Sequence, residues 1–284
     1  MRWERAQAIM IAVFILLDAF LGWRLFAGQA TAVAPLPASG LVTVGNVNVA
    51  GSSVRFEGVL PPAPSRLPTL TVQLEHPDAA RIAASLLGPG AQAQNQGAIA
   101  TYTGASGWLQ AANGALLFHR SGGGGSRPLP TTAQARAAAD QFLARMALVP
   151  ADLVFDRVTL VTGTLAVEYY QRYQGQPVFN GRCEVKVDGQ GVQSATCIWA
   201  DALGPADSPR PILAPAEALQ DLADARGASA GDPLLVQGVV LGYVAATYEA
   251  NAAWPTVPAW RVELSDGSLY YVNAYTGTLV PGPV

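Results

Sequence analysis

One serine of the sequence stands in a pattern typical of hydrolases. Gly227-Ala228-Ser229-Ala230-Gly231 matches the Gly-x-Ser-x-Gly elbow, which exposes a nucleophilic serine between a strand and the helix that follows it. Here the predicted helix comes first and the predicted strand second. Both histidines, His76 and His119, also precede the serine, so the Ser–acid–His order of that fold is impossible. We interpret the segment as a loop, and we predict no catalytic residue.

The remaining polar residues predict no metal and no cofactor. Glu75-His76-Pro77-Asp78 contains ligand types, but no second His or Cys stands at ligand spacing, and a turn before a helix explains it better. No P-loop, dinucleotide-binding glycine motif or His-Glu-x-x-His occurs. Glu168, within VEYYQRY, is the one acid in an aromatic surround. On a strand, this pattern more often marks a mixed sheet face than an active site.

Composition excludes several classes of protein. The chain has 284 residues, of which 50% are hydrophobic and 13% charged. These values exclude a chain-long disordered protein, a coiled coil and a collagen-like fibre. The net charge is −3 and no basic run occurs among the 17 basic residues, so nucleic-acid binding is not expected.

Residues 6–26 form an apolar stretch with two charged residues. At about 1.5 Å per residue, a helix of this length crosses a hydrocarbon layer of about 30 Å. Two arginines precede the stretch, so we place residues 1–5 in the cytoplasm and the bulk of the chain outside the cell membrane, as a single-pass protein. The alternative is a cleaved signal peptide ending at Ala30-Thr31-Ala32, which the length of the apolar run disfavours.

Asp18 lies within this stretch, where a carboxylate costs roughly 2.5–3.5 kcal/mol on insertion scales. In one interpretation, the long apolar run absorbs the penalty. In the other, which we favour slightly, Asp18 meets a polar group on another transmembrane helix. Phe14, Asp18 and Leu21 are then the predicted contact residues.

In the exported part, each predicted helix is followed by predicted antiparallel strands. This order predicts an α+β fold in which each helix packs across a sheet. The predicted organisation is a linker at 27–40, an N-terminal α+β subdomain at 41–120, a Gly-rich linker at 121–130 and helix-plus-meander subdomain(s) at 131–280. The predicted helices are 78–87, 131–148 and 215–225. The predicted strands are 41–55 (one or two), 70–74, two strands within 102–120, 153–161, 165–173, 178–187, 192–199, 234–248, 259–264 and 269–273.

Two predicted turns determine which residues of the adjoining strands are expected to lie opposite each other. Asp266-Gly267 predicts a two-residue hairpin with Leu264 opposite Leu269 and Val262 opposite Tyr271. Residues 188–192 predict a three-residue loop with Asp188 opposite Val192.

This second loop places Cys183 opposite Cys197. Because an exported compartment permits oxidation, we predict a disulfide, with two free core thiols as the alternative.

Several segments resemble the YycI family. The start MRWERAQAIMIAVFILLDAFLGWRLF resembles that family's opening, a Met-x-Trp followed by one membrane helix with a polar residue in its outer half. The segments YYQRYQGQPVFNGRCEVKVDGQG and PAWRVELSDGSLYYVNAYTG are similar to its ectodomain strands. The middle third of the chain matches only loosely. Asp18 is more polar than the expected amide, and the cysteine pair is not a family feature.

The resemblance implies a non-enzymatic, membrane-anchored regulator of a cell-wall-related two-component system. Its implied partners are a sensor histidine kinase of the WalK/YycG type and a YycH-type sister protein. Candidate ectodomain contacts are the strand with Tyr169, Tyr170 and Tyr173 and the terminal hairpin with Tyr271 and Tyr275. That these tyrosines only cover the sheet is an equal alternative.

Two rival functions remain open. The helix-on-meander pattern also suits exported peptide-binding or protease-inhibitor modules of the PepSY or cystatin type. A hydrolase built around Ser229 is the third hypothesis.

Overall fold

The computed structural model describes residues 54–56, 59–122, 127–146, 153–227, 234–245 and 252–283. The predicted membrane segment with Phe14, Asp18 and Leu21, the linker at 27–40 and most of the predicted strand region at 41–55 lie outside these residues. Within the described ranges, no helix has the length and apolar character needed to cross a membrane.

The described chain is rich in sheet, with few helices. The helices are α2 (Ala79–Leu87), α3 (Thr132–Arg145) and α4 (Pro215–Arg226). The first strands are β1 (Val54–Phe56), β2 (Arg66–Leu67), β3 (Leu70–Leu74), β4 (Gln92–Gln96), β5 (Ile99–Gly104), β6 (Gly107–Ala112), β7 (Ala115–Arg120), β8 (Leu153–Val161) and β9 (Thr164–Tyr173). The later strands are β10 (Gln176–Asp188), β11 (Gly191–Ile198), β12 (Ala200–Pro205), β13 (Arg210–Pro211), β14 (Leu234–Val244), β15 (Trp254–Leu264), β16 (Leu269–Asn273) and β17 (Leu279–Val280).

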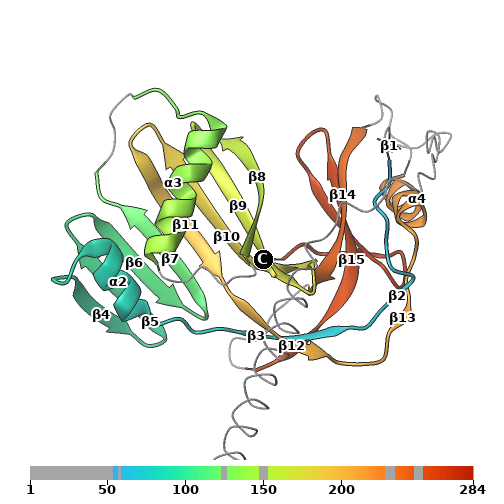
Figure 1. The fold of residues 1–284 in the computed structure, drawn as a ribbon, viewed down its shortest axis with the longest axis horizontal. Helices are drawn as coiled ribbons and strands as arrows, with labels where there is room; N and C mark the ends of the chain where they lie inside the picture. Colours follow the sequence, from blue (N-terminus) through green and yellow to red (C-terminus); the bar gives the residue numbers. More distant parts are fainter. Residues whose placement is uncertain are drawn as a thin grey trace, which may run out of the picture. The chain divides into compact units, whose positions relative to one another are not determined.

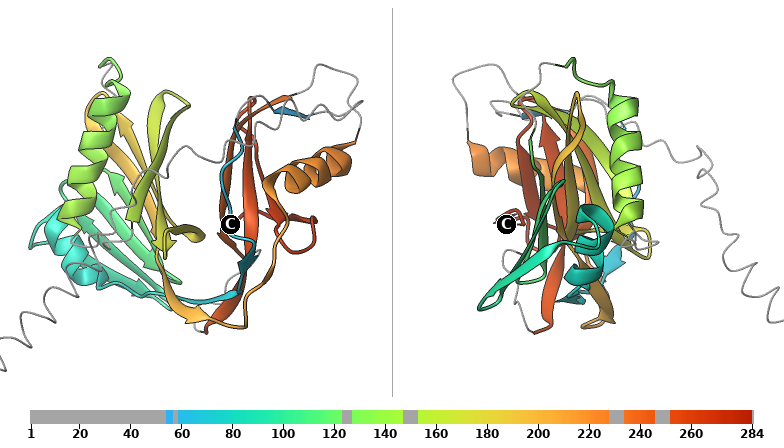
Figure 2. Two further views of the ribbon diagram at one scale, coloured as in Figure 1. Left: turned by 45° about the vertical axis from the view of Figure 1, so that its right-hand side comes forward. Right: turned by 90° about the vertical axis from the view of Figure 1, so that its left-hand side faces the viewer.

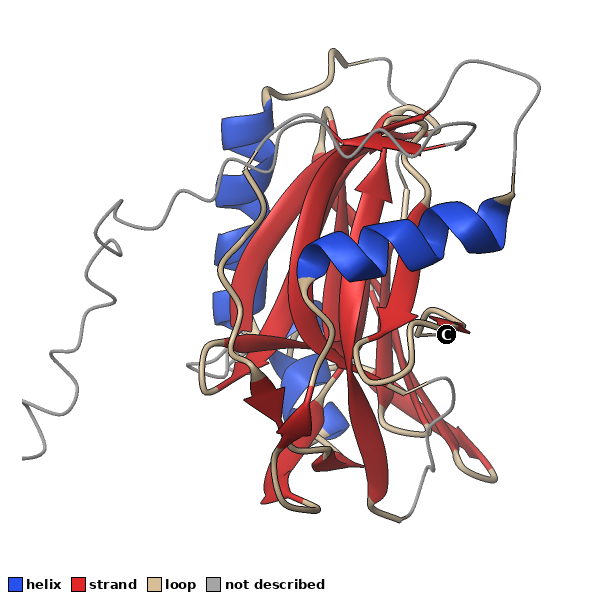
Figure 3. Ribbon diagram, turned by 90° about the vertical axis from the view of Figure 1, so that its right-hand side faces the viewer, coloured by secondary structure: helices blue, strands red, loops and turns tan. Residues whose placement is uncertain are grey.

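The strands form two helix-covered regions joined through β10, β14, β3 and β12 (Figure 1). In the first region the strand order is β10-β11-β7-β6-β5-β4, with β9 and β8 on the other side of β10. In the second region β14, β15, β16 and β17 are neighbours. Figure 2 shows α2 and α3 over the first region, and Figure 3 shows α4 over the second. The predicted α+β arrangement of helices on antiparallel strands is therefore present.

The local signals that begin and end the helices are present in the structure. Asp78 caps α2, because its carboxylate accepts a hydrogen bond from the Arg81 amide at 3.0 Å. The following Gly88 has φ 95°, a conformation that ends the helix at low cost only for glycine. Thr131 and Gln134 form a reciprocal capping box at the start of α3.

Alternation along β15 separates a core face from a polar face. Trp260, Val262 and Leu264 are buried against Leu219 and Leu222 of α4. The intervening residues of β15 therefore point to the opposite face of the sheet, because successive side chains of a strand alternate. The same alternation sends Cys183, Val185 and Val187 of β10 into the core under α3 and leaves Arg182, Glu184 and Lys186 half-buried on the other face.

The predicted register of the β15–β16 hairpin is wrong by one residue. Glu263 pairs with Leu269 and Arg261 pairs with Tyr271, whereas the sequence predicted Leu264 and Val262 at these places. The turn is longer than predicted, because the Leu264 amide donates to the Ser268 carbonyl at 3.0 Å. Inside it, Asp266 accepts hydrogen bonds from the amide and hydroxyl of Ser268. The shift puts Tyr271 beside Arg261 on the polar face.

The structure contains a strand, and a pairing between distant strands, that the sequence did not predict. β4, whose five residues are all exposed, pairs with β5 at the sheet edge. β7 pairs with β11, so strands on either side of the Gly-rich segment 121–130 belong to one sheet.

Candidate functional site

A β-bulge in β8 positions two charged residues of the candidate site. The pairing of β8 with β9 shifts between Phe155 and Arg157, which leaves Asp156 as the extra residue of the bulged strand. A bulge of this kind re-aims a side chain. Two consecutive residues, Asp156 and Arg157, therefore both reach charged partners on other strands, which regular alternation does not allow.

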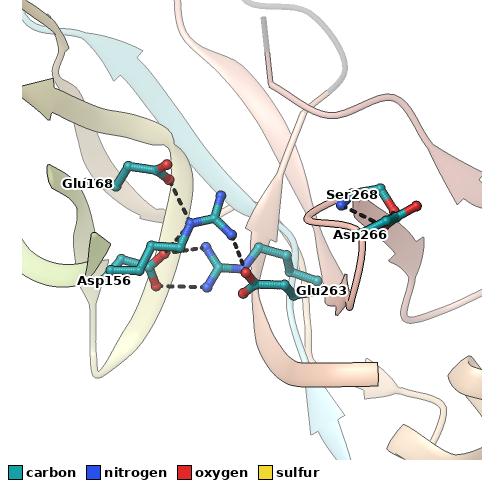
Figure 4. A network of polar contacts seen from close by, with 7 residues as sticks. Asp156, Glu168, Glu263, Asp266 and Ser268 are labelled. Carbon is teal, nitrogen blue, oxygen red and sulfur yellow. Dashed lines mark hydrogen bonds and ion pairs between the residues drawn. The ribbon is translucent and has the colours of Figure 1, made fainter. Parts of the chain in front are cut away.

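Five charged side chains from β8, β9 and β15 form an ion-pair network (Figure 4). Arg157 Nε donates to Glu168 Oε2 at 3.1 Å, and its Nη1 donates to Glu263 Oε1 at 2.7 Å. Arg261 donates from both terminal nitrogens to the two oxygens of Asp156, at 2.7 and 3.1 Å. The network joins the strands of the first region to β15 of the second.

Burial gives the network its electrostatic character. The Arg261 side chain is 5% exposed and lies over the rings of Tyr170 and Phe179, about 5 Å from each ring centre. Burial alone lowers the pKa of Arg261, but the hydrogen bonds and charge of Asp156 outweigh it and hold the pKa above its ordinary value. Burial raises the pKa of Tyr170 and Tyr271, so both hydroxyls are protonated at neutral pH and can donate hydrogen bonds.

A pocket of about 390 Å³ adjoins the network. Its wall includes Arg182 and Glu184 from β10, Thr196 from β11, Tyr170 from β9 and Tyr271 from β16. Gly282 and Pro283, which follow β17, also line it. The pocket combines charged groups and phenol hydroxyls with apolar surface, so it offers both polar and apolar contacts to a small ligand.

Glu168 was the acid that the sequence singled out, and it lies in this pocket. Asp156, Arg157, Arg182, Arg261 and Glu263 were missed. Their signal in the sequence is a set of charged residues inside predicted strands, but nothing in the sequence shows that these strands meet.

The tyrosines predicted as ectodomain contacts fall into two groups. Tyr169, Tyr170 and Tyr271 are only 4–6% exposed, so most of the surface of these side chains is packed within the chain. Tyr169 also donates a hydrogen bond to Asp140 of α3 at 2.7 Å. Tyr173 and Tyr275 are half-buried, and Tyr275 donates to the Leu67 carbonyl at 2.8 Å.

Cys183 and Cys197 stand opposite each other on β10 and β11 and are joined by a disulfide, with Cα atoms 4.1 Å apart. The predicted closing pair is wrong, because Asp188 lies opposite Gly191 and Val187 opposite Val192. A register shift between Lys186 and Val187 compensates for the shorter loop and leaves the two cysteines opposite each other. Both cysteines are buried in the core under α3.

The other candidates for chemistry gain no support as sites. Over the described ranges, no group of three or more His, Cys, Asp or Glu side chains is placed to hold a metal ion. His119 stacks on Trp108, with ring centres 5.7 Å apart. Ser229 lies outside the described residues.

Comparisons with known proteins give one family and two solved structures. Residues 48–275 match the family model described as YycI protein. A crystal structure of an uncharacterized protein from Eubacterium rectale is similar in fold, with 12% identity, a TM-score of 0.54 and coverage of 80% of this chain and 90% of that one. The Bacillus megaterium YpeB C-terminal domain has 14% identity, a TM-score of 0.40 and coverage of 73% and 96%. No curated protein matches the chain.

Proposed function

The chain belongs to the YycI family, and from this premise we propose that it is a non-enzymatic regulator of a sensor histidine kinase of the WalK/YycG type, anchored in the cell membrane by residues 6–26. The observation that carries the proposal is the family match over residues 48–275, which connects the chain with the YycG/WalK system. A YycH-type sister protein is the second partner we propose.

The proposed mechanism acts through helix packing in the membrane. Phe14, Asp18 and Leu21 contact a transmembrane helix of the kinase, and a polar partner there offsets the cost of burying the Asp18 carboxylate. A bias of about 1–3 kcal/mol between two kinase states changes signalling several-fold. On the exported side, the partly exposed Tyr173 and Tyr275 are the remaining aromatic contact candidates.

Co-purification from membranes tests the proposal. The full chain is expected to retain the kinase, and Asp18→Leu is expected to weaken that association because the polar contact is lost. Asp201→Leu is the control, since Asp201 is an exposed carboxylate on β12, remote in sequence from residues 6–26. Equal recovery of the kinase with wild type and Asp18→Leu contradicts the helix-packing mechanism.

The non-enzymatic character has a separate test. An activated serine probe is expected to leave the wild-type chain unlabelled. Labelling that disappears in Ser229→Ala would instead support the hydrolase hypothesis.

A further inference from the structure

Arg182 is a cation of the pocket that the ion-pair network does not use. It lies half-buried on β10, opposite Tyr170 on β9, and lines the pocket wall. Arg157 and Arg261 engage the carboxylates of the network. In the described part of the chain, no hydrogen bond or ion pair engages the Arg182 guanidinium. Its five N–H donors are therefore available to a ligand, and a carboxylate matches the planar, bidentate geometry of a guanidinium.

Two facing carboxylates in the same pocket wall favour a cationic group on the ligand. Glu184 of β10 stands directly opposite Glu168 of β9. Like charges at directly opposed positions of an antiparallel pair are unfavourable. Arg157 bonds Glu168, whereas Glu184 pairs with Lys186 at 3.2 Å, and both side chains of this second pair are more than one-third exposed. Because exposed pairs of this kind are weak, a ligand ammonium group can take the place of Lys186 beside Glu184.

The charges around the pocket balance, which limits the net charge of the ligand. Four carboxylates and four cations form the pocket and its network within the described residues: Asp156, Glu168, Glu184 and Glu263 against Arg157, Arg182, Lys186 and Arg261. A doubly charged anion such as phosphate leaves the site with uncompensated negative charge. A zwitterion preserves the balance.

The spacing of the two charged residues along β10 is compatible with a short ligand. Arg182 and Glu184 are two residues apart on one face of β10, which separates their Cα atoms by roughly 6.8 Å. An extended chain of two residues spans about 7 Å at most. The pocket volume of about 390 Å³ lies within the usual range for small-ligand sites.

We propose that this pocket binds a short zwitterionic peptide of about two residues, with its carboxylate on Arg182 and its ammonium group beside Glu184 and Glu168. The protonated hydroxyls of Tyr170 and Tyr271 are further hydrogen-bond donors in the pocket. This site goes beyond the regulation of a kinase proposed above and does not depend on it, because binding is measured without any partner protein.

The experiment titrates the full chain, in a mild detergent, with L-alanyl-L-alanine and follows binding by calorimetry or ligand-observed NMR. Saturable binding is expected. The N-acetylated dipeptide and the dipeptide amide, each lacking one terminal charge, are expected to bind at least about tenfold more weakly. Both arms use the wild-type chain, so they do not depend on whether a variant folds.

Substitutions of Arg182 test whether this residue binds the carboxylate of the dipeptide. Arg182→Gln is expected to weaken binding of the dipeptide at least about tenfold, and Arg182→Lys is expected to weaken it less, because the charge stays while the fork is lost. Arg172→Gln, an exposed arginine on β9, is the control and is expected to bind as wild type does. The absence of saturation, equal binding by Arg182→Gln, or tighter binding of inorganic phosphate than of the dipeptide each overturns the proposal.

Discussion

Arg261 of β15 donates two hydrogen bonds to Asp156 of β8, although 105 residues separate them in the chain. The pair depends on the bulge that frees Asp156 from the regular alternation of β8. On the same face of the sheet, the observed β15–β16 register places Tyr271 opposite Arg261. The two helix-covered regions are therefore joined by charge as well as by hydrogen-bonded strands.

Removing Asp156 is expected to destabilise the protein strongly. Asp156→Asn leaves the Arg261 guanidinium buried without its counter-charge, and breaking a buried pair in this way costs about 3–5 kcal/mol. Urea unfolding of the full chain measures the change in unfolding free energy. Asp201→Asn, on the exposed face of β12, is the matched control and should change it by less than about 0.5 kcal/mol. A similarly small change for Asp156→Asn would show that the pair contributes little.

Alkaline pH is expected to lower stability through Tyr243. Burial, followed by the neighbouring Tyr275 and Tyr173, raises the pKa of Tyr243 to about 12, from about 10 in an unfolded chain. Between these values the unfolded state has lost the proton and the folded state has kept it. The stabilisation is therefore complete below pH 10 and is lost as the pH rises towards 12. Denaturant unfolding at several pH values should show a shallower decline in Tyr243→Phe than in wild type, and parallel curves would contradict the assignment.

The elements specified by local chemistry were predictable from the sequence. Asp78 and Gly88 predict the ends of α2 because a cap and a stop act within one turn of helix. Pro215 and Gly227 mark the ends of α4 in the same way. The position of Cys183 opposite Cys197 was also predictable, although the loop that closes the hairpin was not.

The pocket was not predictable, because its residues meet only through long-range pairing. In the sequence, nothing distinguishes Arg157 from other arginines in strands. Its contact with Glu263 depends on the bulge in β8 and on the position of β15 beside it. The polar face that Arg182 shares with Glu184 reads in the sequence as a solvated sheet face. Only the neighbouring strands of the other region reveal that the same face lines a pocket.

The disulfide is expected to contribute substantially to stability. Cys183 and Cys197 are 14 residues apart, and closing a loop of about this size stabilises the folded state by roughly 3 kcal/mol. The double variant Cys183→Ala/Cys197→Ala should lower the unfolding free energy by about 2–4 kcal/mol, measured by urea unfolding. Reaction of both thiols with an alkylating agent in the denatured wild-type protein, with no reductant present, would show instead that the bond does not form.

Asn180 is expected to stabilise the contact between β10 and the end of β14. Its amide donates to the Ala245 carbonyl at 3.0 Å and its side-chain oxygen accepts from the Ala245 amide at 2.8 Å, all within buried surroundings. Asn180→Ala leaves both backbone groups without a partner, at about 1–3 kcal/mol for each. Urea unfolding should show this loss, whereas the matched Asn95→Ala on exposed β4 should unfold as wild type does. Because these bonds fasten β10 to the end of β14, hydrogen exchange of the Ala245 amide should accelerate in Asn180→Ala, and unchanged exchange would show that water or another group replaces the amide.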